Sequence, residues 1–483
     1  MTYIGSLDQG TTSTRFIIFD GNGEIVASHQ IEHQQILPQS GWVEHDAEEI
    51  WRNTEIVMAQ ALKSAKLEAK DLIAIGITNQ RETIVVWDQK SGKALANAIV
   101  WQDTRTAEFL NSLSEDAKTK IISKTGTPIA PYFSASKMAW LLKNSISDTS
   151  NLAFGTIDAW ILFKLTGEFK TDVTNASRTQ LMNLETLAWD PELLGIFGIK
   201  KEWLPEIKSS SEIYGKTKEG VPVAGILGDQ QAAMVGQTCF DKGASKTTYG
   251  TGNFALISTG DNLVKSKNGL LTTVLYKLGE APVQYALEGS VAVTGSAIQW
   301  LRDQLGIINS ASEVEALAAS VPDNGGVYFV PAFSGLFAPY WRSDARGVIV
   351  GLTRANTKAH LARAALEAIC YQTKEVLDAM EADSGIKLNE MRVDGGITNN
   401  KLCMQLQSDI MGIDVVKPVI TETTALGAAF AAGLATGVWR DTNEIKSIWK
   451  REKTWHPESS AEWRKAGYQK WRKAITRTFD WVD

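Results

Sequence analysis

Two stretches of the same design constrain the fold of this chain more than any other feature of its sequence. The first, "SLDQGTTSTRFIIFDG", begins at Ser6, and the second, "SKTTYGTGNFALISTG", begins at Ser245. Each consists of a strand-like run, a turn rich in glycine and threonine, and a second strand-like run, which is the pattern of an antiparallel hairpin. Such a recurrence in a chain of 483 residues predicts an internal duplication.

The first turn offers the chemical groups that bind phosphate. Between Gly10 and Arg15 it presents backbone N–H groups, four hydroxyls and one guanidinium, and such groups together bind anions. The usual phosphate loop ends in Gly-Lys-Ser/Thr and opens a helix. Here no lysine follows and the chain enters a strand instead. The sequence therefore predicts a protein that holds phosphate on hairpins.

Length and composition exclude several classes of protein. The net charge of −6 argues against a nucleic-acid partner. No stretch approaches the roughly 18 apolar residues of a membrane span, and the N-terminus lacks the regions of a secretory signal. Three widely spaced cysteines, Cys239, Cys370 and Cys403, indicate reduced thiols rather than disulfides or a zinc site. We therefore expect a cytoplasmic protein, whose oligomeric state stays open and includes a homo-oligomer.

The duplication predicts two α/β domains. Because the second hairpin begins at Ser245, we expect a boundary near residues 238 to 243, with an N-terminal domain of residues 1–241 and a C-terminal domain of residues 242–483. No low-complexity segment separates the halves, which favours a hinge over a flexible tether.

Helices are predicted from the periodicity of apolar residues. Residues Phe133 to Leu142 and Ala153 to Leu165 have the pattern of amphipathic helices. In the basic tail, Ser459 and Glu462 have the spacing of a capping box, and aromatic residues such as Trp463 and Trp471 follow one helical stripe. We expect this stripe to pack on its own domain, because a basic aromatic helix does so far more often than it touches membrane or nucleic acid.

Polar residues at the ends of apolar strands are the candidates for chemistry, and each has a structural alternative. Asp8 is placed to hold Mg²⁺ or to bond the backbone of the turn, and the turn alone does not decide between them. Arg81 and Glu82 together could satisfy a vicinal diol, although a solvated strand end is the better interpretation of this pair alone. Asp229 could act as a general base or as the commoner N-cap of the following helix.

A further candidate lies in "VDGGITNN", where Gly395 and Gly396 would let a flat ring approach the backbone. This motif is weak when taken alone. The four features gain weight because they occur in order at strand ends in two similar halves.

Taken together, these motifs resemble those of the FGGY carbohydrate kinases. The matching stretches are collinear from residue 5 to about residue 435. They include "LDQGTTSTR", "GITNQRET", "IVWQDTRT", "TDVTNASRT", "GDQQAA", "TTYGTGNF", "YALEGSVAVTGSAIQWLRD", "RVDGGITNN" and "TALGAAFAAG". The resemblance implies two ribonuclease-H-like domains of the actin and hexokinase type, with an active-site cleft between them. It also implies ATP-dependent phosphorylation of glycerol to sn-glycerol 3-phosphate, with ATP/ADP and Mg²⁺ as ligands.

The resemblance further implies roles for individual residues. Asp229 would be the catalytic base and Asp8 the Mg²⁺ ligand. The glycerol site would consist of Arg81, Glu82, Trp101, Tyr132, Asp229, Gln230 and Phe254. The phosphate and nucleotide site would consist of Thr11, Thr12, Ser13, Arg15, Thr251, Gly295, Gln299, Gly396 and Asn400, where Asn400 is preferred to Asn399 on the ungapped register.

The chain departs from the family pattern at a few positions. Arg342 stands where an acidic residue is usual, and Asn253 where cysteine is common. The loop "TKEGVPVAG" and the segment "TTVLYKLG" lack the features that two regulatory schemes of the family need. A kinase for another polyol or a ketose stays open as an alternative. So does a non-catalytic actin-like or chaperone-type ATPase, although it would have no use for Arg81, Glu82 and Asp229 together.

Overall fold

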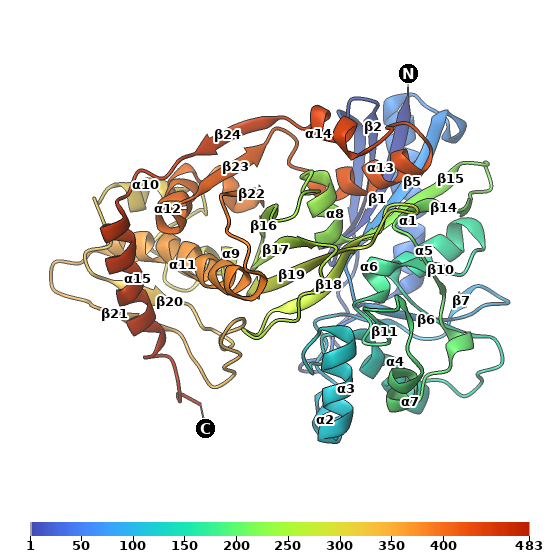
Figure 1. Ribbon diagram of the computed structural model, residues 1–483, viewed down its shortest axis with the longest axis horizontal. Helices are drawn as coiled ribbons and strands as arrows, with labels where there is room; N and C mark the ends of the chain where they lie inside the picture. Colours follow the sequence, from blue (N-terminus) through green and yellow to red (C-terminus); the bar gives the residue numbers. More distant parts are fainter. Residues whose placement is uncertain (1, 483) are drawn as a thin grey trace.

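The computed structural model describes residues 2–482, and two large mixed sheets dominate it (Figure 1). The first sheet has six strands in the order β14-β15-β5-β1-β2-β3. These strands are β1 (Tyr3–Gln9), β2 (Ser13–Asp20), β3 (Ile25–Glu32), β5 (Leu72–Asn79), β14 (Ser211–Lys216) and β15 (Pro222–Gly228). Strands β1, β2 and β3 form an antiparallel meander, while β1, β5 and β15 run parallel.

The second sheet has seven strands in the order β18-β19-β17-β16-β22-β23-β24. These strands are β16 (Ser245–Tyr249), β17 (Asn253–Gly260), β18 (Leu271–Tyr276), β19 (Gln284–Val291), β22 (Glu390–Gly395), β23 (Asp414–Pro418) and β24 (Arg451–Trp455). Strands β16, β17 and β19 are antiparallel, and β16, β22 and β23 are parallel. The second sheet thus repeats the topology of the first, which confirms the predicted duplication.

The central strands of the first sheet, β1, β2, β5 and β15, are buried on both faces, which explains their continuous apolar runs. On one face, side chains such as Phe16 and Ile18 pack with α1 (Ala47–Ala65) and α5 (Ile157–Thr166). On the other face, Ile17 and Phe19 join a core that includes α8 (Asp229–Gly236) and α13 (Thr423–Ala435). Helix α13 lies far along the chain, yet Ser6 Oγ donates a hydrogen bond of 2.6 Å to Ala425 O.

Helices α8 and α13 lie between the two sheets (Figure 1) and meet backbone to backbone. A Cβ added at Gly236 would lie 1.9 Å from Thr423 O, and one added at Gly427 would lie 1.8 Å from Ala232 O. Only glycine permits so close an approach, because it has no Cβ. The two helices therefore have no side chains between them where they are closest.

A smaller five-stranded sheet and several helices extend the N-terminal half. The strands are β4 (Glu44–His45), β6 (Ile84–Asp88), β7 (Lys93–Ala94), β8 (Ala98–Ile99) and β9 (Leu152–Thr156). Residues between Ser134 and Asn144 form α4, as the periodicity near Phe133 to Leu142 suggests. In the C-terminal half, the second sheet packs with α9 (Gly295–Asp303), α11 (Lys358–Ser384), α12 (Lys401–Met411) and α15 (Ala461–Ile475).

Two local predictions are wrong in part. The segment Ala153 to Leu165 is not one amphipathic helix: its first four residues belong to β9, and α5 is buried nearly all round. A helix enclosed by apolar partners on every side has no polar face. In the tail, the N-cap of α15 is Ser460, whose side chain accepts from Trp463 N, while Ser459 Oγ donates to Asp409 O. Trp471 is buried as expected, but Trp463 is 41% exposed.

The three cysteines are free and buried, with 4.0 Å between Cys370 Sγ and Cys403 Sγ. Arg342 forms ion pairs with Asp344 and Asp480, so its positive charge ties its loop to the end of the chain. Across residues 2–482, no helix is long and apolar enough to span a membrane, and no cluster of three or more metal-ligating side chains is present.

Candidate active site

The loop that follows β5 holds Arg81 and Glu82 in a strained conformation. Glu82 has a φ of +62°, and Thr83 N donates a 2.7 Å hydrogen bond to Arg81 O across it. Such a three-residue turn with a left-handed central residue is rare for a glutamate. Ser134 Oγ fixes the turn further by donating to Glu82 O at 2.8 Å. Backbone strain of this kind is characteristic of functional sites, and here it directs a carboxylate inward.

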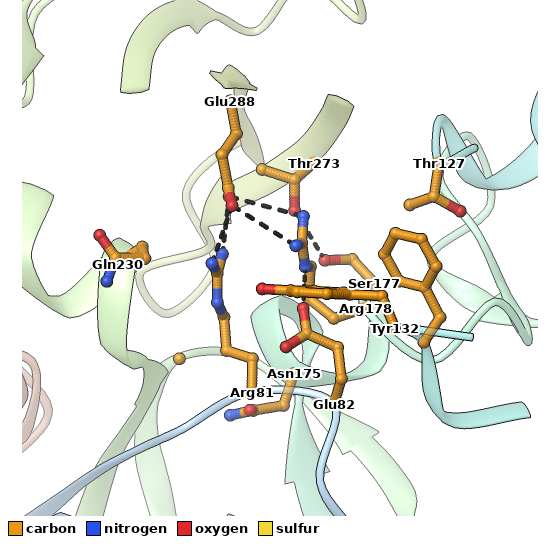
Figure 2. A network of polar contacts seen from close by, with 12 residues as sticks. Arg81, Glu82, Thr127, Tyr132, Asn175, Ser177, Arg178, Gln230, Thr273 and Glu288 are labelled. Carbon is orange, nitrogen blue, oxygen red and sulfur yellow. Dashed lines mark hydrogen bonds and ion pairs between the residues drawn. The ribbon is translucent and has the colours of Figure 1, made fainter. Parts of the chain in front are cut away.

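Arg81 and Glu82 belong to a buried ionic network that spans the two halves of the chain (Figure 2). Arg81 donates from Nη1 and Nη2 to the two carboxylate oxygens of Glu288, at 2.6 and 2.8 Å. Arg178, in the turn after α6 (Val173–Ala176), donates from Nε to Glu82 Oε1 at 2.5 Å and approaches Glu288 at 3.4 Å. Glu288 lies on β19, whereas the other three residues come from the N-terminal half.

The charges of this buried network balance. All four side chains are at most 2% exposed, and two carboxylates face two guanidinium groups. Burial alone would raise the pKa of Glu288, but Arg178 and Arg81 outweigh it and lower that pKa to about 2. For Glu82, burial outweighs the same two arginines and its pKa is raised. Buried charges persist only when they are paired in this way.

Asp229 lies at the edge of the network, where the site opens to solvent. Its Oδ1 is 3.0 Å from Arg81 Nε, and its side chain is 33% exposed. The N-cap of α8 is Gly228, so Asp229 is the first helical residue and not the cap. Next to it, Gln230 Oε1 accepts from the buried Lys246 of β16 at 2.5 Å. Asp229 thus has a fixed position beside Arg81 and remains accessible to a ligand, and a general base needs such access.

Aromatic residues line the same region. The rings of Trp101 and Tyr132 lie 5.2 Å apart, and the Arg178 guanidinium carbon lies 5.9 Å from the Tyr132 ring centre. Trp101 Nε1 donates to Thr11 Oγ1 at 3.0 Å, which connects these rings to the first turn. Phe254 lies on β17, where the strand register places it on the same face of the sheet as Glu288.

The first turn, residues 10 to 13, is held in place by hydrogen bonds to its carbonyl groups. Three consecutive carbonyl groups accept hydrogen bonds: Gly10 O from Gln80 Nε2 at 3.1 Å, Thr11 O from Gln35 Nε2 at 3.0 Å, and Thr12 O from the backbone of His33 at 3.1 Å. His45 lies between Gln35 and Gln80, 3.0 and 3.4 Å from their amide groups. Because the carbonyl groups are engaged on the protein side, the turn is a rigid platform on which Thr12 is exposed.

Asp8 and Arg15 form an ion pair beside this turn. Arg15 contacts Asp8 Oδ2 at 2.7 Å and Glu422 of the C-terminal half at 2.5 Å. Burial raises the pKa of Asp8, and Arg15 opposes that shift. The second carboxylate oxygen of Asp8 has no protein partner among the described contacts. One carboxylate near further acids fits Mg²⁺, which usually takes one or two carboxylates and completes its shell with water and phosphate.

The second turn, residues 250 to 252, is built differently. Thr251 O accepts from the backbone of Thr294 and Ser296, and a Cβ at Gly295 would lie 2.5 Å from Gly250 O. Gly396 lies at the same end of this sheet, because β16 and β22 are parallel and Tyr249 is in register with Gly395. Thr251 and Gln299 are exposed. Asn400 caps α12: its amide oxygen accepts from Cys403 N at 2.8 Å.

Sequence reasoning missed four residues of the site: Arg178, Glu288, Gln231 and Lys246. Each lies in or beside a stretch that resembles the family. No local pattern, however, connects Arg178 to Glu288, which lies 110 residues away. One signal was available. Glu288 is a lone carboxylate within the strand "QYALEGSV", and a charge in a buried strand requires a buried partner.

Comparisons with known proteins cover the whole chain. The model of the N-terminal domain of the FGGY family of carbohydrate kinases matches residues 3–236, and that of the C-terminal domain matches residues 245–436. Glycerol kinase from Mycolicibacterium vanbaalenii is 59% identical, with 100% of this chain and 99% of the relative covered. Glycerol kinase 1 from Streptomyces coelicolor is 58% identical, with 99% and 98% covered.

Among solved structures, Plasmodium falciparum glycerol kinase with ADP is 40% identical and superposes with a TM-score of 0.94, with 99% of this chain and 98% of that chain covered. A ligand-bound xylulose kinase from Lactobacillus acidophilus is 24% identical, with a TM-score of 0.88 and 99% and 97% covered, which concerns the fold alone. The expected class of fold is therefore confirmed.

Proposed function

The chain belongs to the FGGY family of carbohydrate kinases, and on that premise we propose that it phosphorylates glycerol with ATP to give sn-glycerol 3-phosphate. The observation that carries this proposal is the buried network of Arg81, Glu82, Arg178 and Glu288 beside Asp229. It places hydrogen-bond donors and acceptors next to a partly exposed carboxylate. Relatives that are 56–59% identical over full length are glycerol kinases, which supports the same activity.

Asp229 is the general base of the proposed reaction. It takes the proton from the terminal hydroxyl of glycerol as that oxygen attacks the γ-phosphorus of ATP, and ADP leaves. The ion pair with Arg81 at 3.0 Å keeps the carboxylate oriented for this transfer. The side chain of Gln230, fixed by Lys246, borders the same position.

The remaining hydroxyls of glycerol bind to Arg81 and Glu82. Glu82 Oε1 is taken by Arg178, so Oε2 is the oxygen that can accept from a substrate hydroxyl. Trp101, Tyr132 and Phe254 pack against the carbon atoms. A small polyol matches this combination of two charged groups and apolar walls, because its oxygens alternate with short carbon links.

The triphosphate lies between the two turns in this proposal. Thr11, Thr12, Ser13 and Arg15 face phosphate from one half, and Thr251 and Gly295 from the other. Gln299, Gly396 and Asn400 hold the rest of the nucleotide. When Mg²⁺ is bound through Asp8, it neutralises negative charge on the phosphate oxygens. A cytoplasmic location and a domain boundary after residue 241, with a hinge at residues 238 to 243, belong to the proposal as well.

A coupled assay tests the proposal. The purified protein is given ATP and Mg²⁺ with glycerol, xylulose or other small polyols and ketoses, and ADP release is followed. Glycerol is expected to give the highest kcat/KM. A higher value with a ketose would assign the protein to another substrate of the same family. ADP release that does not depend on any acceptor would favour an ATPase without transferase activity.

A further inference from the structure

Glu288 occupies most of the hydrogen-bonding capacity of Arg81. A guanidinium group has five N–H donors in a fixed plane. Glu288 accepts from Nη1 and from Nη2, and Gln231 Oε1 accepts from Nη1 at 3.2 Å. Glu288 and Gln231 therefore use three of the five N–H groups. The other two are the Nε–H group, whose nitrogen lies 3.0 Å from Asp229 Oδ1 in an ion pair, and the second N–H of Nη2.

These two remaining donors lie on one edge of the guanidinium plane and point the same way. Arg342 uses this edge to bind both carboxylate oxygens of Asp344, at 2.6 Å each. In Arg81 the same edge adjoins Asp229, whose Oδ1 lies 3.0 Å from Nε. Two parallel N–H groups beside a general base match two oxygen atoms on adjacent carbons of a polyol.

We propose that Glu288 is a positioning residue for substrate recognition, which holds Arg81 so that its free edge faces Asp229 and selects polyols with vicinal hydroxyls. This inference rests on the proposed function. It attributes the preference of the enzyme for vicinal diols to a residue that does not itself contact the substrate. Glu288 is suited to the task because it is 2% exposed and bonded to Arg81 through both oxygens. The Glu288 carboxylate is oriented in turn by Arg178, whose Nη2 lies 3.4 Å from Oε1 and whose Nη1 lies 3.5 Å from Oε2.

The position of Glu288 in the chain gives this contact a second property. Glu288 lies on β19 of the second sheet, whereas Arg81 follows β5 of the first. Arg81 therefore has its substrate-selecting orientation only while the two halves are in contact at this point. The hydroxyl-binding edge is completed by the half of the molecule that holds the nucleotide.

The competing explanation is that Glu288 serves stability alone, as a counter-charge for two buried arginines. The two explanations differ in what they predict for selectivity. If only stability is lost, the remaining folded enzyme distinguishes substrates as before. If Arg81 loses its orientation, the advantage of a vicinal diol over an isolated hydroxyl decreases.

The experiment compares glycerol with 1,3-propanediol, which lacks the middle hydroxyl, in the wild-type enzyme and in Glu288→Gln. The amide removes the negative charge and one of the two acceptors but keeps the shape. We expect kcat/KM for glycerol to fall by about tenfold or more, mainly through KM, with KM for ATP within about twofold of wild type. The glycerol to 1,3-propanediol ratio of kcat/KM is expected to fall by a similar factor. Glu280→Gln, an exposed glutamate before the same strand, is the matched control and is expected to leave both values unchanged.

A folded Glu288→Gln enzyme with the wild-type ratio would overturn the inference, whatever its thermal stability. If this variant does not fold, Glu288→Asp replaces it: the carboxylate is one methylene shorter and cannot reach both Nη atoms of Arg81 from the same backbone. Its ratio is then expected to fall severalfold, and an unchanged ratio would overturn the inference. A wild-type enzyme that does not phosphorylate glycerol would refute the proposed function, and this inference with it.

Discussion

The part of the site proposed to bind polyol and the part proposed to bind phosphate, here called the polyol side and the phosphate side, are built in different ways. On the polyol side, Arg81, Glu82, Arg178 and Glu288 are buried and bonded to each other across the two halves. On the phosphate side, the turns at residues 10 to 13 and 250 to 252 present exposed backbone and hydroxyl groups. The first turn is braced by glutamine side chains, and the second by the close approach of Gly295 to Gly250.

This difference fits the ligand that is proposed for each side. A neutral polyol offers only hydroxyls, so discrimination depends on donors and acceptors that are fixed before it binds, in a place without water. A triphosphate carries its own charge and binds many N–H groups of similar geometry. Its site therefore needs backbone that is rigid and uncovered. Mutations on the two sides are expected to affect different substrates.

The largest effect is expected where the two sides meet. Asp229→Asn removes the proposed base but keeps the size of the side chain, so kcat is expected to fall by about 100-fold or more, with near-normal ATP binding. Steady-state kinetics and nucleotide titration measure both. Turnover close to wild type would exclude Asp229 as the base.

The next effect separates the polyol side from the phosphate side. Arg81→Ala removes the charged donors proposed for the glycerol hydroxyls and leaves Glu288 and Glu82 to share Arg178. We expect kcat/KM for glycerol to fall by roughly 2 kcal/mol, about 30-fold, or more. The affinity for ATP is expected to change little. Loss of ATP binding with intact glycerol affinity would mean that this arginine faces phosphate, and the proposed map of the site would be wrong.

The bracing of the first turn predicts sensitivity to acid. Burial lowers the pKa of His45 to about 3, with a smaller contribution from His33. The folded state binds the proton on His45 more weakly than the unfolded state does. The contribution of neutral His45 to the free energy of unfolding is therefore complete above the unfolded pKa of about 6.5 and is lost as the pH falls toward 3. Between these limits His45 contributes a slope of up to about 1.4 kcal/mol per pH unit. Urea titration measures the free energy of unfolding of the wild type and of His45→Gln at pH 5 and at pH 7.5. We expect the wild type to lose more of this free energy between pH 7.5 and pH 5 than the variant does. An equal loss in the two proteins would contradict the prediction.

The bracing of the second turn predicts an effect on the nucleotide alone. An alanine Cβ at position 295 would meet Gly250 O at 2.5 Å, so the turn must shift. We expect Gly295→Ala to raise KM for ATP by about tenfold, of order 1 kcal/mol, and to leave KM for glycerol near wild type. Gly195→Ala, in a helix with no atom within 4 Å of the added Cβ, is the control. A change in KM for glycerol of equal size would show that the two sides are not separable.

The smallest effect concerns the distance between the sides. Glycerol with a non-hydrolysable ATP analogue is expected to close the hinge proposed near residues 238 to 243 and to reduce the radius of gyration slightly. Small-angle scattering of the free and ternary states measures this. An unchanged radius, with both ligands bound, would mean that no closure accompanies binding.

The sequence predicts those parts of the molecule that local chemistry determines. The two hairpins follow from their Gly/Thr-rich turns. The ionic network could not be predicted in the same way. Its pairs join residues that are 96 to 207 positions apart, and nothing near Arg81 indicates that Glu288 is its partner. Likewise, the alternative of an N-cap at Asp229 is decided by backbone geometry one residue earlier, at Gly228.

The packing of α13 on the first sheet has a consequence for how the protein is made. The chain emerges from the ribosome with its N-terminus first, and N-terminal domains generally fold before C-terminal ones. Residues 1 to 241 contain every strand of the first sheet, but the helix that covers Ile4 and Phe19 begins only at Thr423. Almost two hundred further residues must therefore be synthesised before α13 can cover this apolar face. The nascent chain is therefore expected to need protection from aggregation until translation is nearly complete.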